Sequence, residues 1–130
     1  MEETIYDPLR RKQVARTPEE MVRQAVIAWL RDGKGVPETR MESEWGFVYN
    51  RRRYRADVVV FDRNLQPLLL VECKAPDVRI DGKVIEQVVR YTRVLPVRYV
   101  LITNGSVHCL LGRSEEGGFV SITGLPDTLG

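Results

Sequence analysis

The feature that most constrains this chain is a pair of apolar runs separated by a short polar turn. The first run ends at Phe61, the second begins at Leu68, and Asp62–Pro67 lies between them. Both runs are rich in valine or leucine, and turn-forming residues separate them. The segment therefore predicts a β-hairpin at the centre of the fold.

Charged residues interrupt these two expected strands. Asp57 lies early in the first, and Glu72 and Lys74 lie at the end of the second. Side chains alternate along a strand, so Glu72 and Lys74 point one way while Val71 and Cys73 point the other. Charges at the end of an apolar strand are costly to desolvate unless they are paired or bind a metal. The pattern indicates a functional site, and a purely structural ion cluster is the alternative.

These residues carry a resemblance to known nucleases. Asp57 followed by Glu72-Cys73-Lys74 resembles the catalytic motif of the PD-(D/E)XK nuclease superfamily. Gln87 and Tyr91 resemble the QxxxY extension found in some of its branches. A bare E-x-K is common by chance, whereas three motifs in this order, each on the expected element, form a more specific signal.

The wider sequence is similar to the type I restriction enzyme R-subunit N-terminal domain family. The similarity extends from about Ile5 to about Gly124. The matching segments are Tyr6–Lys12, Thr17–Gln24, Arg55–Asp57, Pro67–Pro76 and Thr103–Gly105.

The resemblance implies a restriction-endonuclease-like α/β fold, a mixed β-sheet flanked by helices. The expected order is an α-β-β-β-α-β core with a terminal β extension. We expect one domain over 1–130, with its core at about 17–124 and an extended arm at 1–16 that packs through Ile5, Tyr6 and Leu9. We expect strands at about 40–49, 99–103, 107–111 and 119–122, a second helix at about 83–95 and a loose tail at 126–130.

The implied chemistry is hydrolysis of DNA assisted by Mg²⁺, with Mn²⁺ as a substitute. Asp57 and Glu72 offer the hard oxygen ligands that magnesium prefers, helped by the Cys73 carbonyl. Lys74 is expected to orient or deprotonate the attacking water, or to neutralise charge at phosphorus. Gln87 would hold the water or a phosphate. Tyr91 would support Gln87 from the same helix face, or would be an ordinary core aromatic.

The first helix begins with a strong start signal. Thr17 is a good N-cap, Pro18 suits the first helical position, and Glu20 completes a capping box. The helix is expected to reach about Arg31 with an apolar stripe of Val22, Ala25, Val26 and Trp29. In several branches of the nuclease superfamily a first-helix glutamate reaches the metal. We assign that role to Glu20 rather than Glu19, with cap formation as the alternative.

Sixteen of the twenty basic residues are arginine, whose planar guanidinium matches phosphate. Arg51, Arg52, Arg53 and Arg55 form the densest cluster, just before the Asp57 strand. They are predicted to contact the DNA backbone, with an ordinary solvated turn as the alternative.

Several function classes are disfavoured. Gly33–Pro37 lacks the Lys-Ser or Lys-Thr of a P-loop, so we expect no ATP-driven motor of the kind that R subunits carry after their nuclease domain. No glycine-rich strand-to-helix turn supports a nucleotide-binding doubly wound domain. His108, the only histidine, has no acidic neighbour in sequence and is expected to be structural. No cysteine and histidine spacing suits zinc, and no apolar run is long enough to span a membrane. Two cysteines suggest reduced thiols in a cytoplasmic protein, with Cys73 as a packing residue.

Two functions from different classes remain. The first is a metal-dependent DNA endonuclease that acts alone or with separate motor or modification subunits. The second is a nuclease-fold module that binds DNA or a protein partner without cutting. One site per chain means that cutting both strands requires a homodimer or successive nicks.

Overall fold

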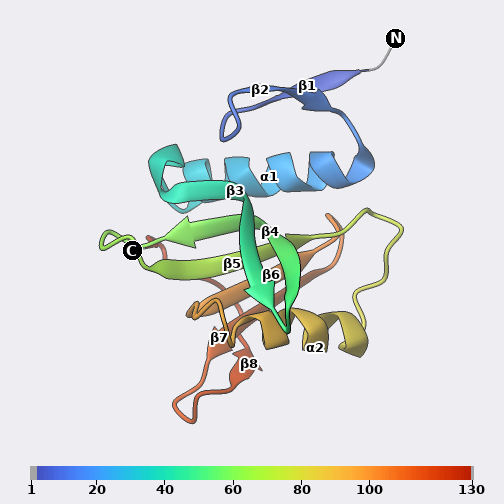
Figure 1. Ribbon diagram of the computed structural model, residues 1–130. Coiled ribbons are helices and arrows are strands. Elements are labelled where there is room, and N and C mark those ends of the chain that lie inside the picture. Colours follow the sequence, from blue (N-terminus) through green and yellow to red (C-terminus); the bar gives the residue numbers. More distant parts are fainter. Residues whose placement is uncertain (1–2, 130) are drawn as a thin grey trace.

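Two helices cover opposite faces of a six-stranded mixed sheet (Figure 1). The computed structural model describes residues 3–129. Helix α1 (Pro18–Gly33) lies on one face and α2 (Gly82–Tyr91) on the other. The expected mixed α/β fold and its element order are confirmed.

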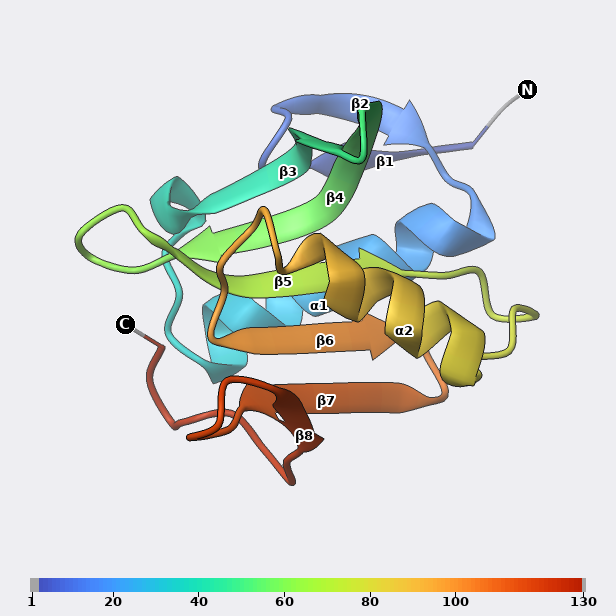
Figure 2. The same ribbon diagram turned by 60° about the horizontal axis from the view of Figure 1, so that its bottom comes forward.

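The sheet has the order β3-β4-β5-β6-β7-β8. β5 and β6 pair in parallel through the α2 crossover, and all other neighbours are antiparallel (Figure 2). A separate β1–β2 hairpin lies against α1 on the side of β3. The strands are β1 Thr4–Asp7, β2 Lys12–Ala15, β3 Met41–Tyr49, β4 Arg52–Phe61, β5 Pro67–Cys73, β6 Tyr99–Thr103, β7 His108–Arg113 and β8 Phe119–Ser121, with a 3-10 turn η1 at Glu38–Arg40.

The central strands are buried on both faces because their side chains alternate between two apolar layers. On β5, Leu69 and Val71 pack toward α1, and Leu70 packs toward α2. All three are completely inaccessible to solvent. Burial of such a side chain contributes about 1.5–3 kcal/mol, so these strands anchor the sheet.

Helix α1 begins as expected, but it presents a different face to the core. Thr17 caps it by accepting a hydrogen bond from the Glu20 backbone N–H at 3.1 Å. The predicted stripe is wrong in part, because Ala25 and Trp29 are exposed. The buried side is formed by Val22, Val26, Ile27 and Leu30. Both stripes have helical spacing, so periodicity alone does not choose between them.

The two ends of the chain also differ from expectation. The arm is a hairpin in which Tyr6 is 52% exposed and Asp7 is fully buried, so Tyr6 is not a packing residue. The predicted loose tail is wrong for Leu129, which is 2% exposed and whose carbonyl accepts from Arg40 at 3.0 Å. The parts of the arm at residues 1–2 and of the tail at residue 130 lie outside the described residues.

The second helix is shorter than expected. It ends at Tyr91, and turns carry the chain on to Leu95, which is still buried. Val88 and Tyr91 form its buried side. Between residues 3 and 129, no helix has the length and apolar character needed to cross a membrane.

Candidate active site

Strands β4 and β5 separate at Asp57. Their antiparallel pairing reaches Val58↔Val71, and the next contact is made by a side chain. Asp57 Oδ2 accepts a hydrogen bond from the Cys73 backbone N–H at 2.7 Å. The carboxylate therefore lies in the gap between two buried strands, where Asp57 is only 8% exposed.

Glu72 brings a second carboxyl group to this gap. Burial, a hydrogen bond with Asp57 and the negative charge of Asp57 raise the pKa of Glu72 to about 9. The positive charge of Lys74 acts in the opposite direction. Without a cation, Glu72 therefore holds a proton at neutral pH, because its half-buried carboxyl group lies beside the buried Asp57 carboxylate.

Lys74 follows β5 directly and is held at the end of β6. Its backbone N–H donates to the Thr103 carbonyl at 2.8 Å. The loop after Lys74 is secured by Asn104, whose side-chain amide donates to the Val78 carbonyl at 2.9 Å. These bonds fix the backbone that carries the lysine.

The donor set suits a hard divalent cation. Among residues 3–129, no three His, Cys, Asp or Glu side chains are grouped to hold a metal. Asp57 and Glu72 supply two carboxyl groups. In a strand the N–H and C=O of one residue point to the same edge, so the Cys73 carbonyl faces the gap with its N–H. Such oxygen donors fit Mg²⁺, which uses one or two carboxylates and retains waters, and a cation would replace the Glu72 proton.

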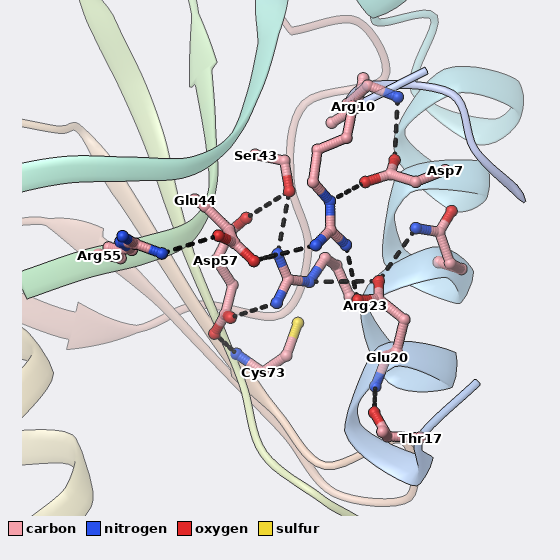
Figure 3. Close-up of polar contacts among 12 residues, drawn as sticks. Asp7, Arg10, Thr17, Glu20, Arg23, Ser43, Glu44, Arg55, Asp57 and Cys73 are labelled. Carbon is pink, nitrogen blue, oxygen red and sulfur yellow. Dashed lines mark hydrogen bonds and ion pairs between the residues drawn. The ribbon is translucent and has the colours of Figure 1, made fainter. Parts of the chain in front are cut away.

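An arginine of α1 also reaches Asp57 (Figure 3). Arg23 Nη2 lies 3.3 Å from Asp57 Oδ1, and Nη1 donates to Ser43 Oγ at 3.0 Å. Arg23 Nε lies 3.4 Å from Glu20, yet the N–H is not aligned for a hydrogen bond. Arg23 is buried, so a positive charge is a built-in neighbour of this carboxylate.

A second arginine connects the β1–β2 hairpin to the same cluster. Arg10 contacts Asp7, Glu20 at 2.6 Å and Glu44 at 2.9 Å (Figure 3). Burial acts to raise the pKa of Asp7, but hydrogen bonds from Arg10 and the Leu9 N–H outweigh it and lower that pKa. Arg10 therefore ties the hairpin to α1 and β3.

The two glutamates at the start of α1 have separate surroundings. Glu20 is buried and accepts from Arg10 and from Gln24, so its carboxylate does not close the expected capping box. Glu19 is exposed, and its charge contributes to the raised pKa values of Glu72 and Cys73.

Gln87 and Tyr91 lie on one face of α2, as their spacing predicts. Tyr91 is 7% exposed, and its ring lies 4.9 Å from that of Tyr54 and 5.1 Å from that of Phe47. Burial, Tyr54 and Glu72 raise the pKa of Tyr91, against a hydrogen bond with the exposed Gln87. Tyr91 is thus a core aromatic, and Gln87 lies near its hydroxyl group.

The arginine cluster divides into two parts. Asn50 and Arg51 both have left-handed backbone angles, φ 53° and 66°, and form the two-residue turn between β3 and β4. Arg51, Arg52 and Arg53 are exposed at this tip. Arg55 instead pairs with Glu44 at 3.2 Å and belongs to the ion cluster around Arg23.

His108 and the cysteines lie apart from this chemistry. His108 Nδ1 is 2.7 Å from Thr103 Oγ1 on the neighbouring strand. Burial raises the pKa values of the Cys73 and Cys109 thiols, and both cysteines are free.

Sequence reasoning did not identify Arg10, Arg23 and Glu44 as neighbours of the site. The available signal was local: Arg10 is three residues after Asp7, and Arg23 is three residues after Glu20. Residues three apart in a helix or a tight turn can contact each other. This spacing does not show that Arg23 also reaches Asp57.

Comparison with known families identifies the central part of the chain. Residues 18–126 match the family described as type I restriction enzyme R protein N terminus. The matched segment contains both helices and the whole six-stranded sheet, and the β1–β2 hairpin precedes it. No match was found among curated proteins or among solved structures.

Proposed function

The chain belongs to the type I restriction enzyme R protein N-terminal family, and on that premise we propose that it is a metal-dependent endonuclease that hydrolyses DNA phosphodiester bonds. The observation that carries the proposal is the gap between β4 and β5. There the Asp57 and Glu72 carboxyl groups meet, and the charge of Lys74 acts on Glu72. The family context supports nuclease chemistry.

Asp57, Glu72 and the Cys73 carbonyl would hold Mg²⁺ or Mn²⁺. When bound, the cation supplies Lewis-acid stabilisation of charge on the phosphoryl and leaving oxygens. Asp57 is ready for this task because the Cys73 N–H fixes its orientation. Glu72 must release its proton, so cation binding should be favoured as pH rises.

Lys74 is proposed to act on the attacking water or on the phosphoryl oxygens. Its ammonium group can orient the water or stabilise negative charge in the transition state, and the neutral amine form could accept the proton of the water. Gln87 is exposed and lies near the Tyr91 hydroxyl group. It is proposed to bind the water or a phosphate. Tyr91 then acts by positioning Gln87.

For the first-helix acid we propose Glu19 in place of Glu20. The Glu20 carboxylate accepts hydrogen bonds from Arg10 and Gln24, whereas Glu19 is exposed. An exposed carboxylate can contact the outer water shell of a cation without giving up an ion pair.

DNA is the proposed substrate, and Arg51, Arg52 and Arg53 are proposed to contact its backbone. Separate motor or modification subunits are proposed partners, as is a second copy of the chain for cutting both strands. A non-cutting module remains the alternative, because the ion pair between Arg23 and Asp57 is also what a structural ion cluster would contain.

The test is a cleavage assay over duplex, single-stranded, flap and branched DNA with Mg²⁺, Mn²⁺ or EDTA. The parent protein is expected to cut at least one substrate with Mg²⁺ or Mn²⁺ and none with EDTA. Glu72→Gln, which retains shape but removes an anionic ligand, is expected to be inactive. A parent protein that binds DNA but cuts none with either metal would support the binding module.

A further inference from the structure

We propose that Arg23 is a resident counter-ion of the metal site: it shares Asp57 with the divalent cation and keeps metal affinity lower than the two carboxylates alone would give. This inference rests on the proposed function. Its starting point is that Asp57 already has a cationic partner, with Arg23 Nη2 at 3.3 Å from Oδ1.

The ion pairs of Arg23 are numerous but long, although Nη1 also donates a hydrogen bond to Ser43 Oγ at 3.0 Å. Its ion pairs with Glu20, Glu44 and Asp57 measure 3.4, 3.5 and 3.3 Å. Its buried Nε–H has no hydrogen-bond partner. A guanidinium group that binds one carboxylate through two short parallel hydrogen bonds would be fixed in place. Arg23 instead divides its charge among three acids, so it can shift toward Glu20 and Glu44 when a cation occupies Asp57.

Two effects of Arg23 on metal binding oppose each other. It orients Asp57, which favours binding, and it repels a second cation, which disfavours binding. The orienting effect is partly redundant, because the Cys73 N–H also holds Asp57, at 2.7 Å. The repulsion is larger, since two cations a few ångströms apart repel enough for about a tenfold change in affinity or more. Loss of the Arg23 charge should therefore tighten metal binding.

The β1–β2 hairpin takes part through Arg10. Arg10 binds the same Glu20 and Glu44 carboxylates at 2.6 and 2.9 Å and so limits how strongly they attract Arg23. If Arg10 is removed, Glu20 and Glu44 lose one of their cationic partners. They then attract Arg23 more strongly and draw it away from Asp57. Arg10→Gln should then tighten metal binding by about threefold, less than Arg23→Gln, because Arg10 does not contact Asp57.

The experiment is titration calorimetry with Mn²⁺ alone, with no DNA present, after circular dichroism has shown that each variant is folded. The variants are Arg23→Gln, Arg23→Lys and Arg10→Gln. The matched control is Arg31→Gln, which removes an arginine of the same helix whose ion pairs are to the exposed Asp32 and Glu38.

The expected result is an Mn²⁺ affinity about tenfold higher or more for Arg23→Gln, an affinity near the parent value for Arg23→Lys, and no change for Arg31→Gln. A purely structural role would weaken binding in both Arg23 variants. If Arg23→Gln does not fold, Arg10→Gln provides the test, and the expected result is again an increase in Mn²⁺ affinity. Unchanged or weaker binding in the folded variants, beside a parent that binds Mn²⁺, would overturn this inference and leave the proposed function standing. A parent that binds no Mn²⁺ would overturn both.

Discussion

Asp57 and Glu72 occupy one gap but have different partners. Asp57 has two partners: it accepts a hydrogen bond from the Cys73 N–H and forms an ion pair with the Arg23 guanidinium. Glu72 has Asp57 itself as its hydrogen-bond partner, and its pKa is raised to about 9. One carboxyl group is therefore held in place by the protein, and the other holds a proton that a cation would displace.

This arrangement predicts how the metal-free protein responds to pH. The pKa of Glu72 in the folded state, about 9, lies above its ordinary value of 4.5, so the native state binds this proton more tightly than the unfolded state. The resulting stability is fully present below pH 4.5 and is lost as pH rises toward 9. Unfolding by urea in EDTA across this range should show a declining free energy for the parent and a smaller decline for Glu72→Gln. Equal declines in both proteins would contradict the assignment.

Replacement of Asp57 and replacement of Glu72 should have different effects on the stability of the metal-free protein. Asp57→Asn deprives the buried Arg23 of an anionic partner and should lower metal-free stability by about 1–3 kcal/mol. Glu72→Gln removes the repelling group and should leave stability unchanged or raised. Both should abolish stabilisation by Mn²⁺, which thermal unfolding with and without the ion can measure. A similar large loss in both variants would favour a structural ion cluster.

At the residue scale, sequence reasoning selected Asp57 and Glu72 as candidates because a charge within an apolar strand is locally conspicuous. Glu72 and Lys74 follow the valines and leucines of β5, so their cost of burial could be recognised without a structure. Arg23 could not be linked to Asp57 in that way, since their contact depends on how α1 lies on the sheet. The choice between Glu20 and Glu19 stays a prediction, because adjacent helical residues point about 100° apart and spacing alone does not show which of them faces the site.

At the scale of elements, the sequence was sufficient to predict a helix or strand wherever that element carries a local signal, such as a helix cap or an apolar run. Thr17 and Pro18 predicted the start of α1, and the two apolar runs predicted β4 and β5. The β1–β2 hairpin was not predicted, because its turn places Arg11 at φ 55° without a glycine or asparagine there to signal it. The docked tail was missed because it depends on a distant partner, Arg40.

The tip of the β3–β4 hairpin should behave as a DNA-binding element. Replacing Arg51, Arg52 and Arg53 with alanine should weaken binding to all sequences and flatten the salt dependence of affinity by up to about three ion equivalents. Affinity measured against salt concentration tests this. Arg63→Ala, in the turn at the opposite end of β4, serves as the control. Unchanged binding in the triple variant would identify the tip as an ordinary solvated turn.

At the scale of the whole molecule, the candidate site gathers contributions from distant segments. Strands β4 and β5 supply the carboxylates, while α1 supplies Glu19 and Arg23 and α2 supplies Gln87. The β1–β2 hairpin, which precedes the segment that matches the family, joins through Arg10. The segment that matches the family therefore carries most of the candidate site, and the hairpin extends its ion cluster.

The most direct test of this account measures DNA binding and DNA cleavage on the same Lys74→Ala protein. Lys83→Ala, which removes an exposed lysine at the start of α2, controls for the loss of one positive charge. We expect Lys74→Ala to bind DNA nearly as well as the parent and to lose Mg²⁺-dependent cleavage by at least about a hundredfold, while Lys83→Ala retains it. Cleavage by Lys74→Ala at the parent rate, with DNA affinity unchanged, would contradict the account.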